Sequence, residues 1–370
     1  MITNAMITNA LTVAQKLLVA GRKEVLAVGL MMLYTLGIPH PANAQEVTYI
    51  IFDPPGSTFT QPASINAEGA ITGTYGDAQY VIHGFLRARD GTVTTFDPPG
   101  AAYTFPATIN QAGAIAGAYT DAQFLSHCFL RAPDGSFITC DPPGTKGTGF
   151  GPGAGAAAIN GAGVITGSYN SGTRIHGFLR SRAGTFTKFD VPGATTTVPT
   201  GINEAMEITG GYYDKHQVFH GFLRARDGTL TTFDAPGSTT TTNPIGINRA
   251  EEIAGYYDDA NGVNHGFLRA RDGTFTTFDG PGASFVGTVP TGINSKGEIT
   301  GWYDDANGAN HGFLRAPDGT ITTFDPPGYS GTDPSGINSA GTIIGVVNQG
   351  HGFVRMEDKR EQEDEQGDKN

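Results

Sequence analysis

The chain has 370 residues, including 54 Gly, 22 Pro and only 2 Cys, and its formal net charge at pH 7 is -12. This negative charge argues against a nucleic acid or an anionic membrane as partner. The many Gly and Pro residues, together with few long apolar runs, favour short strands and tight turns over helices.

The N-terminal region has the pattern of a secretory signal. A basic region, an apolar stretch and a small-residue site follow one another as Lys16, Arg22 and Lys23, then Val25–Ile38, then Ala42-Asn43-Ala44. The apolar stretch is shorter than the roughly 20 residues of a spanning helix, which makes a retained membrane anchor the weaker alternative. We therefore predict that residues 1–44 are removed before Gln45. The mature chain would be secreted or periplasmic, with no insertion into the membrane.

A sequence repeat of about 45 residues recurs along the rest of the chain, and this period is typical of a four-stranded propeller blade. Its clearest mark, His-Gly-Phe (His-Cys-Phe once), begins at His83, His127, His176, His220, His265, His311 and His351. Each repeat offers four alternating segments bounded by Gly, Pro, Asn and Asp, which predicts four strands. In one repeat the first predicted strand ends in Ile293-Asn294, and the second lies in Gly297–Tyr303. The third predicted strand is His311–Arg315, and the fourth ends in Thr322–Asp325.

The two ends of the repeat array indicate how it closes. Val47–Asp53 reads as a fourth strand with no blade before it, and His351–Arg355 reads as a third strand with no fourth strand after it. Pairing them would remove the free sheet edges. We predict an all-β fold over residues 45–355, a seven-bladed β-propeller of four-stranded antiparallel blades closed by the N-terminal strand; an open solenoid is the alternative. The charged tail, residues 356–370, is expected to be disordered.

The hairpin between the third and fourth strands can be read in register. Pro133-Asp134-Gly135 suits a tight turn with Gly at positive φ. Counting outward from Ala132 opposite Ser136 places Cys128 opposite Cys140. In an exported protein this predicts a cross-strand disulfide worth about 2–3 kcal/mol; two buried thiols are the alternative.

The same register places a His opposite an Asp in each repeat: His83 and Asp97, His176 and Asp190, His311 and Asp325. Such pairs could be catalytic dyads or metal sites. Because they recur in every blade, we interpret them as hydrogen bonds that lock the third strand to the fourth. The repeated Arg and Tyr residues are expected to pack between blades.

The His-Gly-Phe-Leu-Arg, Asp-Gly-Thr, Thr-Thr-Phe-Asp and Gly-Ile-Asn motifs over Val47–Arg355 resemble the extracellular HAF-type repeat of exported bacterial proteins. The resemblance implies export and a repeat array, and it carries no assigned reaction. Cys128, Cys140 and Val347 depart from the repeat.

Two loops could hold calcium, which takes six to eight oxygen ligands. Their acidic and amide residues are Asp258, Asp259 and Asn261 in one repeat and Asp304, Asp305 and Asn307 in the next. Further ligands are missing and Asn-Gly is itself a turn signal, so plain turns are favoured and no other cofactor is expected.

Two aromatic residues, Tyr256 and Trp302, occupy a position where other repeats carry small residues. Beside Asp and Asn they could form a sugar-stacking platform; packing between blades is the favoured alternative. Another repeat contributes Asp214 and His216, the one histidine of the mature chain outside the motif.

The sequence favours a monomeric, non-catalytic binding propeller whose ligand is a polysaccharide or an envelope or extracellular protein, because variation falls on the loops of one face. One alternative is a hydrolase or lyase for sugars or lactones, with Asp214, His216, Asp259 and Asp305 at the channel mouth. The other is a purely structural surface protein.

Overall fold

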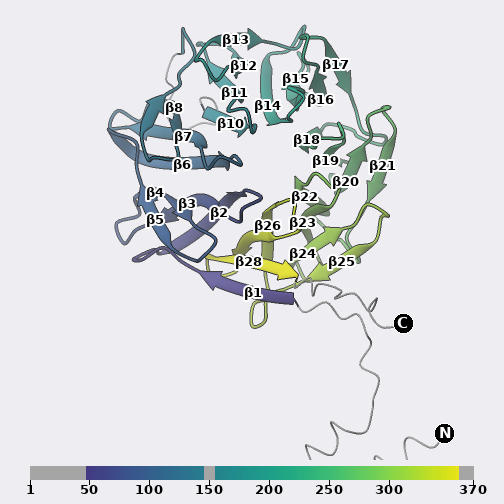
Figure 1. The fold of residues 1–370 in the computed structure, drawn as a ribbon. Coiled ribbons are helices and arrows are strands. Elements are labelled where there is room, and N and C mark those ends of the chain that lie inside the picture. Colours follow the sequence, from purple (N-terminus) through teal and green to yellow (C-terminus); the bar gives the residue numbers. More distant parts are fainter. Residues whose placement is uncertain (1–46, 146–154, 358–370) are drawn as a thin grey trace, which may run out of the picture. The chain divides into compact units, whose positions relative to one another are not determined.

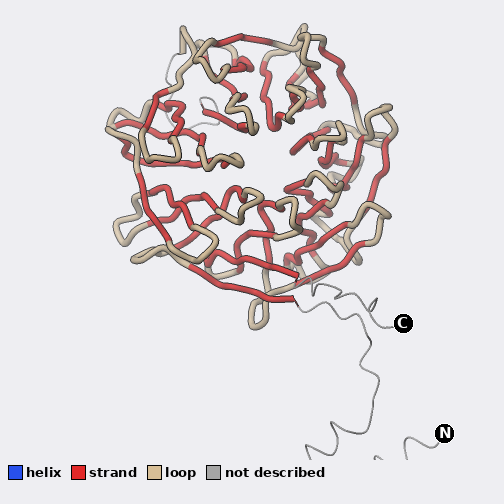
Figure 2. The backbone as a smooth tube through the Cα atoms, viewed as in Figure 1, coloured by secondary structure: helices blue, strands red, loops and turns tan. Residues whose placement is uncertain are grey.

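The computed structural model describes residues 47–145 and 155–357. The predicted signal, residues 1–44, and residues 358–370 of the predicted tail lie outside the described residues. Every regular element of the described part is a strand (Figure 2). Within the same part there is no helix long and apolar enough to cross a membrane.

The first two strands of each repeat form a hairpin around an Asn-x-x-Gly or related turn. The first strands are β2 (Phe59–Ile65), β6 (Ala101–Ile109), β10 (Gly155–Ile159), β14 (Thr196–Ile202), β18 (Thr242–Ile247), β22 (Thr288–Ile293) and β26 (Thr332–Ile337). The second strands are β3 (Ile71–Gly76), β7 (Ile115–Asp121), β11 (Ile165–Asn170), β15 (Ile208–Tyr213), β19 (Ile253–Asp258), β23 (Ile299–Asp304) and β27 (Ile343–Val347). The second strands begin with a fully buried Ile, so the hairpins anchor the cores.

The third and fourth strands form the outer hairpin. The third strands are β4 (Ile82–Arg87), β8 (Ser126–Arg131), β12 (Ile175–Arg180), β16 (Phe219–Arg224), β20 (Asn264–Arg269), β24 (Asn310–Arg315) and β28 (His351–Glu357). The fourth strands are β5 (Val93–Phe96), β9 (Phe137–Thr139), β13 (Phe186–Phe189), β17 (Leu230–Phe233), β21 (Phe275–Phe278), β25 (Ile321–Phe324) and β1 (Val47–Phe52).

These strands make antiparallel sheets arranged around a central axis (Figure 1). Five sheets have four strands, and one has eight because a single parallel pair, Ile175 with Thr196, joins two four-stranded sets. β1 pairs with β28 over its whole length. The arrangement is that of a β-propeller, and we name each blade by its first strand, so that the β2 blade is β2–β5 and the β26 blade is β26–β28 with β1.

A closed set of hydrogen bonds links the first strands around the axis. The Asn that follows each first strand donates from Nδ2 to the backbone carbonyl of the equivalent Asn in the next blade, at 2.9–3.3 Å. The set runs through Asn66, Asn110, Asn160, Asn203, Asn248, Asn294 and Asn338, and Asn338 donates back to Asn66. These residues are buried, so each bond satisfies groups that water does not reach.

Cation–π contacts also join neighbouring blades, as expected for the repeated Arg. Arg87, at the end of β4, lies 5.0 Å from the ring centre of Phe52 in the preceding blade. The same contact recurs at 4.9–5.0 Å in five further blades, between Arg131 and Phe96, Arg224 and Phe189, Arg269 and Phe233, Arg315 and Phe278, and Arg355 and Phe324. The repeated Tyr residues do more than pack between blades, because Tyr75 also lies beside His83 of its own blade at 5.2 Å.

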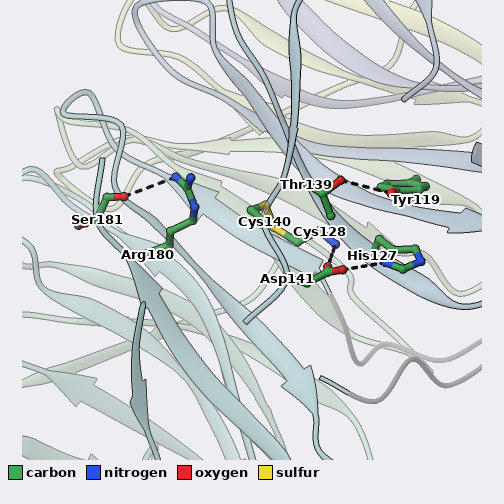
Figure 3. The surroundings of a disulfide bond; sticks show 8 residues. All are labelled: Tyr119, His127, Cys128, Thr139, Cys140, Asp141, Arg180 and Ser181. Carbon is green, nitrogen blue, oxygen red and sulfur yellow. Dashed lines mark hydrogen bonds and ion pairs between the residues drawn. A yellow bond between two sulfur atoms is a disulfide. The ribbon is translucent and has the colours of Figure 1, made fainter. Parts of the chain in front are cut away.

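The β6 blade carries the predicted disulfide, Cys128–Cys140, with the Cα atoms 4.9 Å apart (Figure 3). In the β2 blade this pair of positions is Gly84 opposite Phe96, and a Cβ on Gly84 would lie 2.6 Å from the Phe96 ring. The cystine thus fills the space that Gly and Phe share elsewhere. Because Phe is missing here, Arg180 of the next blade lies instead over Phe186 of its own blade, at 5.8 Å.

The propeller extends two residues beyond the predicted boundary at Arg355. Met356 and Glu357 continue β28 because Thr48 and Val47 of β1 provide their antiparallel partners. The predicted tail therefore begins later than residue 356.

Replacing Cys128 by Gly and Cys140 by Phe should restore the usual pair and return a Phe to Arg180. We expect the double variant to fold and its thermal unfolding, followed by circular dichroism, to be independent of dithiothreitol. The wild type should lose about 2–3 kcal/mol once the bond is reduced. Cys128→Gly alone, which removes the bond without adding the ring, is the control and should be less stable than the double variant. Equal sensitivity of wild type and double variant to the reductant would contradict this.

Candidate functional site

The propeller has two chemically different faces. We call one the loop face; it carries the connections from second to third strands and from each fourth strand to the next first strand. The turn face carries the Asn-x-x-Gly and Asp-Gly turns. The antiparallel order of the strands places every predicted His–Asp pair on the loop face.

The His of each His-Gly-Phe or His-Cys-Phe motif donates a hydrogen bond from Nδ1 to the carboxylate of the Asp that follows the fourth strand. The Nδ1–Oδ distances are 2.6–2.8 Å for His83–Asp97, His127–Asp141, His176–Asp190, His220–Asp234, His265–Asp279, His311–Asp325 and His351–Asp53. Asp97 also accepts a hydrogen bond of 2.5 Å from Thr104 Oγ1 in the next blade. The pair therefore links two blades as well as two strands.

A second group faces the other ring nitrogen of the His. His83 Nε2 lies 3.5 Å from Asp77 Oδ2, and His127 Nε2 lies 3.3 Å from Asp121 Oδ2. Burial lowers the pKa of His83, but the hydrogen bonds and charges of Asp97 and Asp77 outweigh it and leave this pKa raised. His83 and His127 therefore each lie between two carboxylates. At His176 the second partner is a hydroxyl, because Ser171 Oγ lies 2.8 Å from Nε2 while Nδ1 lies 2.8 Å from Asp190.

Five of the loops after the second strands share one turn, and an Asp caps each of them, including the predicted Asp214, Asp259 and Asp305. Asp259 Oδ1 accepts hydrogen bonds from the backbone amides of Asn261 and Val263, at 2.8 and 2.9 Å. The equivalent bonds bind Asp305 to Asn307 and Ala309, and Asp214 to His216 and Val218. The bond from the Val263 amide is the main reason that the pKa of Asp259 is lowered. His216 is exposed on its turn, and Asp214 contacts its backbone amide.

The two remaining calcium candidates also bind backbone amides. Asp258 Oδ1 accepts from Thr240 and Thr241, and Asp304 Oδ1 accepts from Val286 and Gly287. In the residues that the structure describes, no group of three or more His, Cys, Asp or Glu side chains is placed to hold a metal. These oxygens are engaged in building the loops, so the donor set fits turns better than calcium.

Tyr256 and Trp302 are half-buried and lie on the side of their sheets that faces the next blade. Tyr256 is directly opposite Gly266, which is opposite Phe278, and directly opposite residues share a sheet face. Phe278 contacts Phe313 of the next blade at 6.0 Å. The two aromatics thus point the same way around the ring, which favours packing between blades over a shared platform.

A cavity of about 250 Å³ lies on the axis among the first strands. Its wall consists only of Ala, Ser, Thr, Gly and Ile from β2, β6, β10, β14, β18, β22 and β26. None of Asp214, His216, Asp259 or Asp305 lines it, so the expected grouping of these residues at the channel is absent from the described structure. The wall itself offers no acid, base or strong nucleophile.

Four exposed aromatic residues lie on the loop face, on different blades, and none of them was a predicted site residue. Tyr80 is 77% exposed, Phe285 75%, Phe124 43% and Tyr213 39%. The signal was present in the sequence: Tyr80 and Phe124 occupy the turn position at which Gly262 and Gly308 stand in two other repeats.

The loop face also holds most of the excess negative charge. In the part of the chain that the structure describes, this face carries Arg174, Lys188 and Lys215 against a larger set of aspartates: Asp53, Asp77, Asp97, Asp121, Asp141, Asp190, Asp214, Asp234, Asp258, Asp259, Asp279, Asp304, Asp305, Asp325 and Asp333. On the turn face, the Arg residues that end the third strands and those of the turns nearly balance the acids. The charge therefore distinguishes one face from the other.

The turn face also varies between blades. Glu207, Glu252 and Glu298 accept hydrogen bonds of 2.5–2.7 Å from the Asn of their own blades. The equivalent residues of the β2, β6 and β10 blades are Ala70, Ala114 and Val164. Burial and the nearby Glu207 raise the pKa of Glu251 in this region.

Comparisons by sequence found no relative: no protein-family model and no curated protein matches the chain. Solved structures are similar in fold. A streptogramin B lyase is 15% identical with a TM-score of 0.56, covering 84% of this chain and 98% of its own. Virginiamycin B lyase from Staphylococcus aureus with quinupristin gives the same identity and TM-score, covering 84% and 99%. YCF48 bound to D1 peptide is 9% identical with a TM-score of 0.53, covering 85% and 98%. At these identities the likeness establishes the propeller fold alone.

The His–Asp pairs predict a stability optimum in mild acid. The pKa of His311 is raised, chiefly by its hydrogen bond to Asp325, and His83 and His127 are raised as well. Their stabilisation is complete below the unfolded pKa of about 6.5 and is lost as pH rises through the raised folded values. The capping aspartates, such as Asp77 and Asp259, have lowered pKa values, so their contribution disappears on acidification below about pH 4.

The free energy of unfolding, measured with urea across a range of pH, should show both the decline above pH 6.5 and the decline in acid. His311→Gln, which keeps a donor beside Asp325 but does not titrate, should flatten the decline above pH 6.5. His216→Gln, the same substitution at an exposed turn outside the His–Asp pairs, is the control for the decline above pH 6.5. An unchanged alkaline limb in His311→Gln would show that this pair does not couple to folding.

Trp302 is the only Trp in the chain, so its fluorescence reports the interface between the β22 and β26 blades. We expect its emission maximum to be the same with and without each glycan of a panel. Trp302→Thr, which introduces the residue found at Thr74, should lower the free energy of unfolding by about 1–3 kcal/mol. Trp302→Phe, which keeps an apolar ring, should lose less. A glycan-induced shift in emission would instead support the sugar platform.

Proposed function

We propose that this protein is an exported, non-catalytic binding propeller whose loop face takes an envelope or extracellular protein, or a polysaccharide. One observation carries the proposal: exposed aromatic side chains and unbalanced negative charge lie together on the loop face. Monomeric proteins rarely expose large apolar side chains together without a partner for them. The rest of the repeat serves as a rigid frame for these loops.

We also infer that the propeller has seven blades and that β1 closes it. The pairing of β1 with β28 supports this inference, because it completes the β26 blade with a strand from the other end of the chain. The hydrogen bond from Asn338 to Asn66 supports it as well. Export is supported by the disulfide, since such bonds form and persist in oxidising compartments.

A hydrolase or lyase is the competing function. It would need an acid, base or nucleophile beside a cavity that can hold a substrate. The axial cavity has a wall without titratable groups, and the repeated His residues bond to Asp through Nδ1. His176, whose Nε2 lies beside the Ser171 hydroxyl, does not line this cavity. These features favour binding over catalysis.

The proposal can be tested with the intact chain immobilised for biolayer interferometry against a polysaccharide panel and fractionated envelope proteins. We expect saturable binding to one class, with the ligand recovered chemically unchanged. The same ligand should bind when the chain is held by its turn face and not when it is held by its loop face. Conversion of a ligand would establish the enzyme, and absence of any binding would support a structural role.

A further inference from the structure

The turn after the second strand carries an aromatic residue in two blades and Gly or Gln in three others, so the blades can be compared at one position. Its fourth residue has positive φ in five blades: Tyr80 (61°), Phe124 (59°), Gln217 (64°), Gly262 (78°) and Gly308 (78°). Gly adopts this conformation without steric cost, whereas a bulky L-residue is strained there. The turn itself is the same in all five, capped by an Asp whose Oδ1 accepts two backbone amides.

Neither aromatic ring is needed to form this turn, since Gly262 and Gly308 make it without one. Tyr80 is 77% exposed, so its ring adds little to the buried core. Phe124 is 43% exposed and stacks on Tyr103 with ring centres 6.2 Å apart, and Leu125 beside it is also exposed. In the β2 and β6 blades, apolar side chains on adjacent loops of one face therefore stand at positions where a positive φ strains the backbone.

The charge around these two loops indicates the partner. Asp77 and Asp121 begin the loops, and backbone hydrogen bonds lower their pKa values, so both are ionised at neutral pH. Among the residues that the structure describes, the lysines and arginines of the loop face are Arg174, Lys188 and Lys215, and they lie on the β10 and β14 blades. These carboxylates would repel an anionic glycan, and a neutral glycan would offer them no group of opposite charge. Aromatic rings beside carboxylates suit Lys and Arg side chains, which bind by ion pairs and cation–π contacts.

We infer that loops 77–81 and 121–125 form the contact site and that their partner is a protein segment bearing Lys or Arg together with apolar side chains. This inference rests on the proposed function and specifies its ligand. Tyr80 and Phe124 are the anchors, because aromatic residues carry a large share of the binding energy at protein interfaces. Asp77 and Asp121 hold the loops in shape and supply the charge that selects a basic segment.

The test uses the intact chain and short fluorescein-labelled peptides in which Leu alternates with Lys, with Gln or with Glu, read by fluorescence anisotropy. The Lys peptide should bind at least about tenfold more tightly than the Gln peptide and should weaken with salt, while the Glu peptide should not bind. The double variant Tyr80→Gly with Phe124→Gly should lose about tenfold or more in affinity for the Lys peptide.

Gln217→Gly is the matched control, because it makes the same backbone change at the same turn position without removing an aromatic ring. It should bind as the wild type does. The double variant should be at least as heat-stable as the wild type, because Gly relieves the positive φ, and this check separates lost contact from lost fold.

Equal binding of the Lys and Gln peptides, or unchanged affinity in the double variant, would overturn the inference. If a polysaccharide from the panel binds the wild type and loses affinity in the double variant, the partner class is wrong while the binding function stands. If neither the peptides nor any polysaccharide or envelope fraction binds, both the inference and the proposed function fail.

Discussion

In three blades the aspartate that follows the fourth strand accepts hydrogen bonds from the His of its own blade and from a Thr of the next one. Asp97 accepts from His83 in its own blade and from Thr104 in the next one, and Asp325 is shared in the same way by His311 and Thr332. In other blades the equivalent Thr accepts from a linker amide instead, as Thr242 does from Ala235. Because this contact sits where the chain passes between blades, it fixes how each blade meets its neighbour. The loops that emerge beside it are held at a defined angle.

The structural contacts and the proposed contact site fall on different residues of the repeat. The Asn set around the axis, the Arg–Phe contacts and the His–Asp pairs use side chains that recur from blade to blade. Those groups are largely buried or mutually satisfied, so substitutions there would disturb packing before they changed recognition. The loops differ at positions that the frame does not need, such as Tyr80 and Phe124. A repeat of this kind can change its ligand without changing its core.

The frame could be predicted from the sequence because its signals are periodic. The strand order and the disulfide followed from the repeat and from counting residues across one hairpin, and the structure confirms both. The site could not be derived in the same way. That Asp259 caps a turn, or that Tyr80 occupies a left-handed position, depends on backbone geometry that the residue types alone do not specify. The side of the sheet on which Trp302 lies could be derived only from the pairing register of three strands.

The pairing of β1 with β28 also constrains the order of folding. The hydrogen bond between His351 and Asp53 spans 298 residues, whereas the pairs within other blades close over short separations. Bringing such distant segments together carries a larger loop-closure entropy, so this blade should assemble last. Until β28 has been synthesised, β1 lacks the antiparallel partner that it has in the folded structure. For the export proposed above, late completion of this blade would keep the chain unfolded for longer after synthesis.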